Sequence, residues 1–250
     1  MPSGKAVCIV SGGMDSVCYS AVLGQKFELY MITFSYGQRA KREISRAREF
    51  SRVLKAGDHK VVDISFMKDL YGKSNALTDA AQRLPRSFER NLVVPVRNAI
   101  FLTIATAWAM SINAKTVAYG AHTGDTESYP DCRPEFSRSL EQTLNLAEAD
   151  GIAAGTRGAV SILSPAIEKI DKPSLIRAGH RILGDGIFRT WSCYSDGIRL
   201  GRNYVHCGRC ESCINRKVAL YRAGIEDKTH YAENSSGRKP SAAKRDIYKH

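Results

Sequence analysis

The sequence contains few of the features that would place a protein in a membrane or outside the cell. No run approaches the roughly 20 apolar residues of a membrane helix. The start, Met1-Pro2-Ser3-Gly4-Lys5, lacks the apolar region and cleavage site of a signal peptide. There is no internal repeat, and low-complexity sequence is confined to the C-terminal end. These absences predict a cytoplasmic protein with no membrane partner.

Acidic residues are scarce relative to basic ones. The 250 residues include 37 Lys and Arg against 25 Asp and Glu, a formal net charge of +12. This balance favours polyanionic partners such as nucleotides, phosphates or nucleic acid. Part of the excess lies between Arg39 and Lys60, where eight basic residues accompany three acidic ones. A solvated helix face also explains such a run without any ligand.

Short apolar runs alternate with helical patterns along most of the chain. The predicted strands are Ala6–Val10, Glu28–Phe34, Val61–Ile64, Thr116–Tyr119 and Ser161–Leu163. Helices are predicted over Gln38–Lys55 and Asn98–Ile112. This alternation predicts an α/β protein with a Rossmann-like parallel sheet. The stretch from Gly72 to Arg90 has no convincing period and is predicted to be a long excursion.

A glycine-rich loop, Ser11-Gly12-Gly13-Met14-Asp15-Ser16, follows the first predicted strand and opens a helix. Ligands bind at this edge of an open α/β sheet. The glycines let phosphate oxygens approach the backbone amides, and the helix N-terminus adds a favourable dipole. The loop lacks the Gly-Lys-Ser/Thr ending of a Walker A motif, so cleavage between the α and β phosphates is favoured. An ordinary glycine-rich turn is the alternative.

This hexapeptide resembles the signature of the PP-loop ATP pyrophosphatases, of the adenine nucleotide alpha hydrolase type. Three further segments resemble one branch, the 7-cyano-7-deazaguanine synthases of the queuosine and archaeosine pathways. They are Phe34-Ser35-Tyr36-Gly37-Gln38-Arg39, Val94-Pro95-Val96-Arg97-Asn98 and Tyr129-Pro130-Asp131-Cys132-Arg133-Pro134-Glu135-Phe136. With the cysteine segment, the resemblance covers about residues 5 to 225. The chain departs from the family at Val96, where glycine is usual, and in the stretch from Gly120 to Asp125.

The resemblance implies a reaction, its cofactors and a set of site residues. It implies that 7-carboxy-7-deazaguanine and ammonia become the nitrile through adenylated intermediates, with two ATP consumed and with AMP and pyrophosphate favoured over ADP-type products. It also implies magnesium at the phosphates and a homodimer. The residues implied for catalysis are Ser11, Asp15, Ser16 and Arg97. The residues implied for ATP binding are Val10, Ser11, Gly12, Gly13, Met14, Asp15, Ser16, Val17, Cys18, Tyr19 and Ser20.

The substrate is expected to meet residues from the three further segments. Those residues are Tyr36, Gln38, Arg39, Arg97, Asn98, Tyr129, Asp131 and Arg133. Asp131 could accept two hydrogen bonds from the amidine-like edge of a guanine ring. Arg97 and Arg133 could hold the substrate carboxylate or the phosphates, because a guanidinium fork matches either anion.

The seven cysteines point to metal binding or catalysis rather than disulfides, given a cytosolic chain. Four of them, Cys193, Cys207, Cys210 and Cys213, are spaced so that their thiolates can complete a tetrahedron around a structural zinc. An iron–sulfur cluster is the alternative, although the usual fourth Cys followed by Pro is absent. Residues 194–206 lengthen a gap that is usually shorter in the family, and His206 is expected at the surface.

The sequence also predicts the places of the other three cysteines and the domain boundaries. Cys8 and Cys18 are expected to be buried packing residues, and Cys132 to lie in the pocket. Residues 1–190 are predicted to form the PP-loop nucleotide-binding and catalytic domain, and 191–231 a zinc-binding helical segment. Residues 232–250 are predicted to be a basic, flexible tail.

Two other activities stay open. A PP-loop tRNA-modifying enzyme, such as a thiolase, would bind RNA through the basic helix and tail, but it would need a sulfur-relaying cysteine pair, and Cys132 has no evident partner. A deazaguanine transferase would join the activated carboxylate to an amine of a protein or nucleic acid, and the altered segment around His122 together with the basic tail keeps this alternative open. Direct nucleic-acid binding is therefore open but not favoured. A protein with a decayed site is disfavoured by the intact Ser11, Asp15, Arg97 and Asp131.

Overall fold

A computed structural model describes residues 4–232 of the chain. Its centre is a parallel sheet with the strand order β3-β2-β1-β4-β5. The strands are β1 (Lys5–Ile9), β2 (Glu28–Ser35), β3 (Asp58–Asp63), β4 (Thr116–Ala118) and β5 (Ser161–Leu163). The predicted Rossmann-like sheet is confirmed. Four strands lie within one residue of their predicted bounds, and β3 begins three residues before the predicted Val61. The predicted flexibility of the tail concerns residues outside the described range, apart from Ala232.

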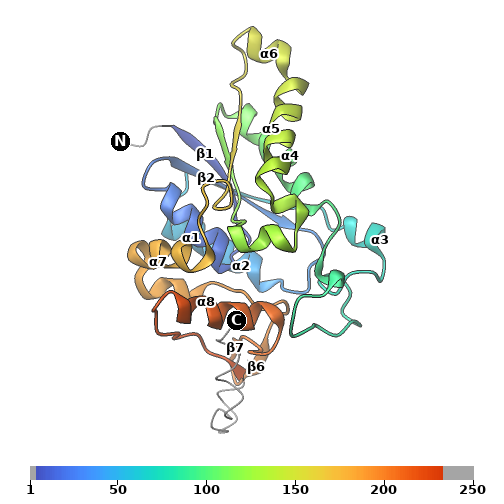
Figure 1. The fold of residues 1–250 in the computed structure, drawn as a ribbon, viewed down its shortest axis with the longest axis vertical. Coiled ribbons are helices and arrows are strands. Elements are labelled where there is room, and N and C mark those ends of the chain that lie inside the picture. Colours follow the sequence, from blue (N-terminus) through green and yellow to red (C-terminus); the bar gives the residue numbers. More distant parts are fainter. Residues whose placement is uncertain (1–3, 233–250) are drawn as a thin grey trace.

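Side chains alternate between the two faces of the sheet, and each face has its own core. On β1, Val7 belongs to one core while Ala6 and Cys8 belong to the other. Helices cover both faces (Figure 1). The first core includes residues of α4 (Arg97–Ser111) and α5 (Pro134–Ala147). The second includes residues of α1 (Met14–Leu23), α2 (Arg42–Val53), α7 (Lys172–Leu183) and α8 (Glu211–Arg222).

The shorter elements lie mostly in the connections. They are α3 (Met67–Tyr71), η1 (Arg90–Leu92), η2 (Thr123–Glu127), η3 (Pro130–Cys132), α6 (Ala149–Ala153), η4 (Gly184–Arg189), β6 (Ile198–Leu200) and β7 (Asn203–Val205). The predicted excursion from Gly72 to Arg90 contains no helix or strand before η1 begins at its last residue. β6 and β7 form an antiparallel hairpin inside the segment 194–206, so the longer gap between the first two clustered cysteines is a structured ribbon.

One stretch of the described residues, Arg90–Ser111, is long and apolar enough to cross a membrane by length and composition alone. The expectation that no stretch approaches that length therefore needs correction. α4 makes up most of it and packs against β1 and β4, with Leu102, Ala105 and Ala109 fully buried. These contacts are those of a core helix, since the apolar side chains are used within the protein itself.

The C-terminal segment folds back onto the sheet. Arg216 of α8 is fully buried and donates to Thr190, Ser192 and Thr229. The backbone N–H of Trp191 donates to the carbonyl of Gly12 at 2.9 Å. The segment that carries the cysteines thus contacts the glycine-rich loop directly, and the boundary near Thr190 stays a prediction.

Candidate active site and metal centre

The glycine-rich loop is held by its own hydroxyls. The Ser11 hydroxyl accepts from the Gly13 N–H at 3.1 Å, and the Ser16 hydroxyl donates to the Gly13 carbonyl at 3.1 Å. Gly12 has φ +89°, and a Cβ there would lie 2.2 Å from the Glu43 carbonyl oxygen. Glycine is therefore required for this path of the backbone. This path of the loop places the first N–H groups of α1 at the end of β1, where they favour the binding of an anion.

A charged cluster lies beside the loop. The Lys172 ammonium contacts Asp15 Oδ2 at 2.9 Å. Burial opposes the charge on both groups, yet each stabilises the other, so the pKa of Asp15 is lowered and the pKa of Lys172 is raised. Asp125 is next to them and contacts His122 at 3.5 Å, and burial raises its pKa. Asp15 Oδ1 is buried without a hydrogen-bond partner in the described part of the chain.

Tyr36, Arg97, Asn98 and Cys132 line the same pocket as the loop, with a volume of about 290 Å³. Arg97 donates to the Tyr36 hydroxyl at 3.3 Å and stands 5.6 Å from its ring centroid. The Asn98 amide donates to the Cys132 sulfur at 3.3 Å. Gln38 and Tyr129 also line the pocket, so residues from three separate sequence segments meet the loop. The expected place of Cys132 in the pocket is confirmed.

Several predicted site residues lie outside the lining of this pocket. Arg39 points into the excursion and donates to the carbonyls of Ala76, Asp79 and Gln82. Arg133 is exposed and donates to the Thr126 carbonyl. Asp131 accepts from the Asn98 backbone N–H at 3.1 Å, near the start of α4. The roles of these three residues in substrate binding stay predictions.

The predicted ATP-binding stretch divides in a similar way. The pocket is lined by Val10, Ser11, Gly13, Met14, Asp15 and Ser16. Gly12 is not in the lining and packs against the Glu43 carbonyl. The residues that follow are buried in the core face of α1, namely Val17, Cys18, Tyr19 and Ser20. Burial of Cys8 and Cys18 is confirmed.

The pocket also contains residues that the sequence did not single out. Lys172 is the first residue of α7, directly after the helix cap Asp171, which is the one local signal that could have pointed to it. Burial raises the pKa of Glu43 to about 8. The Tyr194 hydroxyl donates to the Glu211 carboxylate at 2.6 Å, and both come from the cysteine segment.

Val96 occupies a backbone conformation that suits glycine better than valine. Its φ is +49°, in the left-handed region that β-branched residues avoid. It is the residue before α4 and is largely exposed, so its side chain meets no obstacle, but its backbone is strained. This strain lies next to the pocket residues Arg97 and Asn98.

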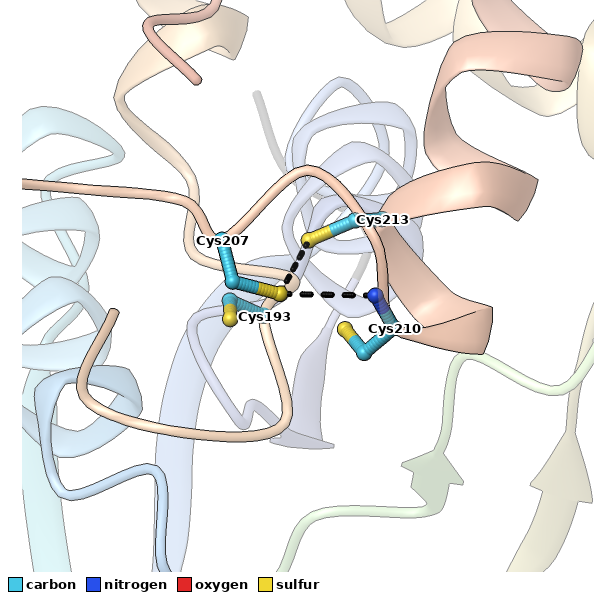
Figure 2. Close-up of side chains that lie close together, drawn as sticks. All are labelled: Cys193, Cys207, Cys210 and Cys213. Atoms are coloured by element: carbon cyan, nitrogen blue, oxygen red, sulfur yellow. Dashed lines mark hydrogen bonds between the residues drawn. The ribbon is translucent and has the colours of Figure 1, made fainter. Parts of the chain in front are cut away.

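The four clustered cysteines meet in one place (Figure 2). Their sulfur atoms lie within 4.8 Å of one another, and all four residues are buried. Cys207 and Cys213 have a sulfur–sulfur distance of 3.9 Å. A tetrahedral zinc with bonds of about 2.3 Å needs sulfur atoms roughly 3.8 Å apart. The donor set and its spacing therefore fit a metal ion.

Contacts within the cluster stabilise the thiolate of Cys207, whereas the pKa values of Cys210 and Cys213 are raised, first by their contacts with Cys193. The Cys210 backbone N–H donates to the Cys207 sulfur at 3.4 Å. The pKa of the Cys207 thiol is lowered, first because Cys193 hydrogen-bonds to it. His206 is buried and stacks on Trp191 with ring centroids 4.4 Å apart, so the expectation of a surface histidine is wrong. Its ring accepts the Ser192 N–H instead.

Comparison with known proteins gives consistent matches. Residues 5–224 match the family described as the queuosine biosynthesis protein QueC. A 7-cyano-7-deazaguanine synthase of Caldicellulosiruptor saccharolyticus is 36% identical over 234 residues, covering 91% of this chain and 95% of the relative. One from Legionella pneumophila is 37% identical over 232 residues, covering 91% and 96%. Among solved structures, the U34-tRNA thiolase NcsA of Methanococcus maripaludis, with its 4Fe-4S cluster, is 16% identical over 73% of this chain and 58% of that chain, with a TM-score of 0.40.

Proposed function

The chain belongs to the QueC family, and we propose that it uses ATP to convert 7-carboxy-7-deazaguanine and ammonia into 7-cyano-7-deazaguanine. The observation that carries this proposal is the shared pocket. One cavity joins the glycine-rich loop to Arg97, Asn98 and Tyr129. A nucleotide and a small anionic base analogue can therefore meet there.

In the proposed reaction a substrate carboxylate oxygen attacks the α phosphorus of ATP, and pyrophosphate leaves. Ammonia then displaces AMP to give the amide, with loss of one proton. The amide oxygen then attacks the α phosphorus of a second ATP, with loss of pyrophosphate and one amide proton, and loss of AMP and the remaining N–H proton forms the nitrile. No protein nucleophile takes part, so positioning and charge stabilisation carry catalysis. The N–H groups at the start of α1 hold phosphate oxygens, and Arg97 balances the anion of the substrate.

Magnesium is part of this proposal. The unpartnered Oδ1 of Asp15 is a suitable oxygen ligand, because magnesium is bound by carboxylates together with phosphate oxygens. The ion would neutralise phosphate charge. Lys172 holds the other oxygen of Asp15 and so fixes the direction of the free one.

Zinc is proposed for the cluster of Cys193, Cys207, Cys210 and Cys213. Four sulfur ligands leave no open coordination position, so the ion would stabilise the fold and take no part in the chemistry. A cytoplasmic location and a homodimer are further parts of the proposal, in line with the family resemblance.

The test is incubation of the purified chain with ATP, ammonium and 7-carboxy-7-deazaguanine, followed by mass spectrometry. The expected products are the nitrile, AMP and pyrophosphate. Asp15→Ala should abolish turnover, whereas Asp69→Ala, at an exposed position of α3, should not. ADP and orthophosphate as primary products would overturn the mechanism. A deazaguanine amide attached to a macromolecular amine would favour the transferase. The thiolase has less support, because Cys132 is the one cysteine that lines the described pocket.

A further inference from the structure

A second cavity, of about 530 Å³, lies apart from the loop pocket. Its walls come from the excursion, from the segment leading into the hairpin and from the turn between the clustered cysteines. The lining residues are Arg39, Gln82, Arg83, Leu84, Arg86, Ser195, Ile198, Cys207, Arg209 and Cys210. None of these lines the loop pocket. Apart from Cys207 and Cys210, which belong to the proposed zinc cluster, the proposed nitrile-forming reaction gives the lining of this cavity no role.

The charge of the cavity is strongly one-sided. Four of its lining residues are arginines, and none is Asp or Glu. Arg83, Arg86 and Arg209 are exposed, and no ion pair within residues 4–232 includes them. Several cations gathered in a concave site without counter-charges raise the local concentration of anions. Such a site is matched by a ligand with more than one negative charge.

Arg39 makes the cavity wall rigid. One of its terminal nitrogens donates to the carbonyls of Ala76, Asp79 and Gln82, at 3.1, 3.3 and 2.7 Å. These bonds fix the part of the excursion that leads to Arg83 and Arg86. The guanidinium groups of Arg83 and Arg86 therefore lie on a loop that is already held in place, so the loop loses less conformational entropy when a ligand binds.

The apolar part of the wall indicates more than a bare inorganic ion. Leu84 and Ile198 face the same cavity as the arginines, and Ile198 is 39% exposed. Guanidinium groups bind phosphate through a fork of N–H donors and stack on flat rings. A volume of this size is in the range of small-molecule sites. We propose that this arginine cavity binds the phosphate groups of a nucleotide, either free or within a nucleic-acid strand.

The experiment measures fluorescence anisotropy of a fluorescein-labelled 12-nucleotide single-stranded RNA with the full chain. The ATP analogue α,β-methylene-ATP is present to fill the loop pocket. The triple variant Arg83→Gln, Arg86→Gln and Arg209→Gln is compared with a control that loses the same charge elsewhere. The control is Arg48→Gln, Arg138→Gln and Arg181→Gln, three exposed positions on α2, α5 and α7.

The cavity variant should bind the RNA at least tenfold more weakly, and the control less than twofold. The slope of log affinity against log salt should fall by about two, because roughly 0.7 ions are released per phosphate contact on a single strand. Metal content and nitrile formation should be unchanged. Unlabelled adenosine 3′,5′-bisphosphate separates the sources. If the bisphosphate displaces the labelled RNA at concentrations near its own Kd, the ligand is a free nucleotide. If the bisphosphate does not displace the RNA, the ligand is a nucleic-acid strand. Equal losses in both variants, or no binding of either probe to the unaltered chain, would overturn the proposal.

Discussion

The glycine-rich loop and the cysteine cluster reach a defined shape in different ways. The loop is fixed by the chain itself, through the hydroxyls of Ser11 and Ser16 and the bond from Trp191 to Gly12. The cluster consists of four buried thiols whose hydrogen bonds are long, such as the 3.4 Å contacts from Cys193 to the Ser195 hydroxyl and from the Cys210 N–H to the Cys207 sulfur. We therefore expect the loop to keep its shape without a ligand, and the cysteine segment to depend on a bound metal ion for its fold.

The largest expected effect is on the cluster. Cys210→Ser should remove bound zinc, and structural zinc sites contribute on the order of 10 kcal/mol of apparent binding free energy. The C-terminal segment should melt, and activity should fall indirectly because Tyr194 and Glu211 line the pocket. Elemental analysis and circular dichroism check this. Cys8→Ala, in β1, should keep the metal. Iron with labile sulfide, or less than about half an equivalent of zinc in the unaltered chain, would contradict the assignment.

The second effect concerns the link between the two regions. Arg216→Met leaves the oxygens of Thr190, Ser192 and Thr229 without their donor, which should cost about 3 kcal/mol of unfolding free energy. Because Trp191 lies within this network and binds Gly12, the affinity for ATP should fall as well. Urea unfolding and calorimetry with the nucleotide measure the two effects, with the exposed Arg202→Met as control. Unchanged ATP affinity in a destabilised variant would show that the regions are independent.

The third effect is confined to the loop. Gly12→Ala imposes a side chain at φ +89° and a clash with the Glu43 carbonyl, so we expect a loss of about 2 kcal/mol in stability and of ATP binding. Gly186→Ala, whose Cβ would have its nearest neighbour at 4.0 Å, is the matched control. Zinc content should be normal in both. A stable Gly12→Ala chain that still binds ATP would mean that the loop is more adaptable than its hydrogen bonds indicate.

The smallest effect is a pH dependence of the loop region. The pKa of Glu43 is raised by burial from 4.5 to about 8, so the folded chain binds its proton more tightly than the unfolded chain. Its stabilising contribution is complete below about pH 4.5 and is lost as the pH rises toward 8. Glu43→Gln mimics the neutral carboxyl, so it should remove the part of the fall in unfolding free energy that Glu43 causes as the pH rises. We expect that part to be only about 1 kcal/mol, because water reaches part of the side chain. Urea unfolding at pH 5, 7 and 8.5 checks this, and parallel curves for the two chains would refute it.

Local patterns were sufficient to find the sheet, the glycine-rich loop and the cysteine cluster. Buried parallel strands are short apolar runs, so all five could be found from sequence, and the cysteine spacing identified a set that meets in space. The loop was recognisable because backbone geometry requires a glycine at Gly12. These signals all lie within short stretches of the chain, the longest running from Cys193 to Cys213.

The rest of the site depends on where side chains point and on which distant segments meet in the fold, and no local sequence pattern contains this information. Arg39 and Arg133 stand in motif segments, yet their side chains bind backbone carbonyls elsewhere. Lys172 and Glu43 reach the pocket from α7 and α2, where single charged residues look like any helix surface. His206 is buried because the aromatic rings of Trp191 and Tyr231 lie on either side of it in the fold.

The bond from Trp191 to Gly12 also has a consequence for the order of events during synthesis. The loop is among the first parts of the chain to leave the ribosome, but the N–H of Trp191, which donates to the Gly12 carbonyl, lies 179 residues later (191 minus 12). At about 5 to 20 residues per second, that interval is roughly 10 to 40 s. If the loop binds ATP as proposed, we expect a nascent chain to complete that site only after the C-terminal segment emerges.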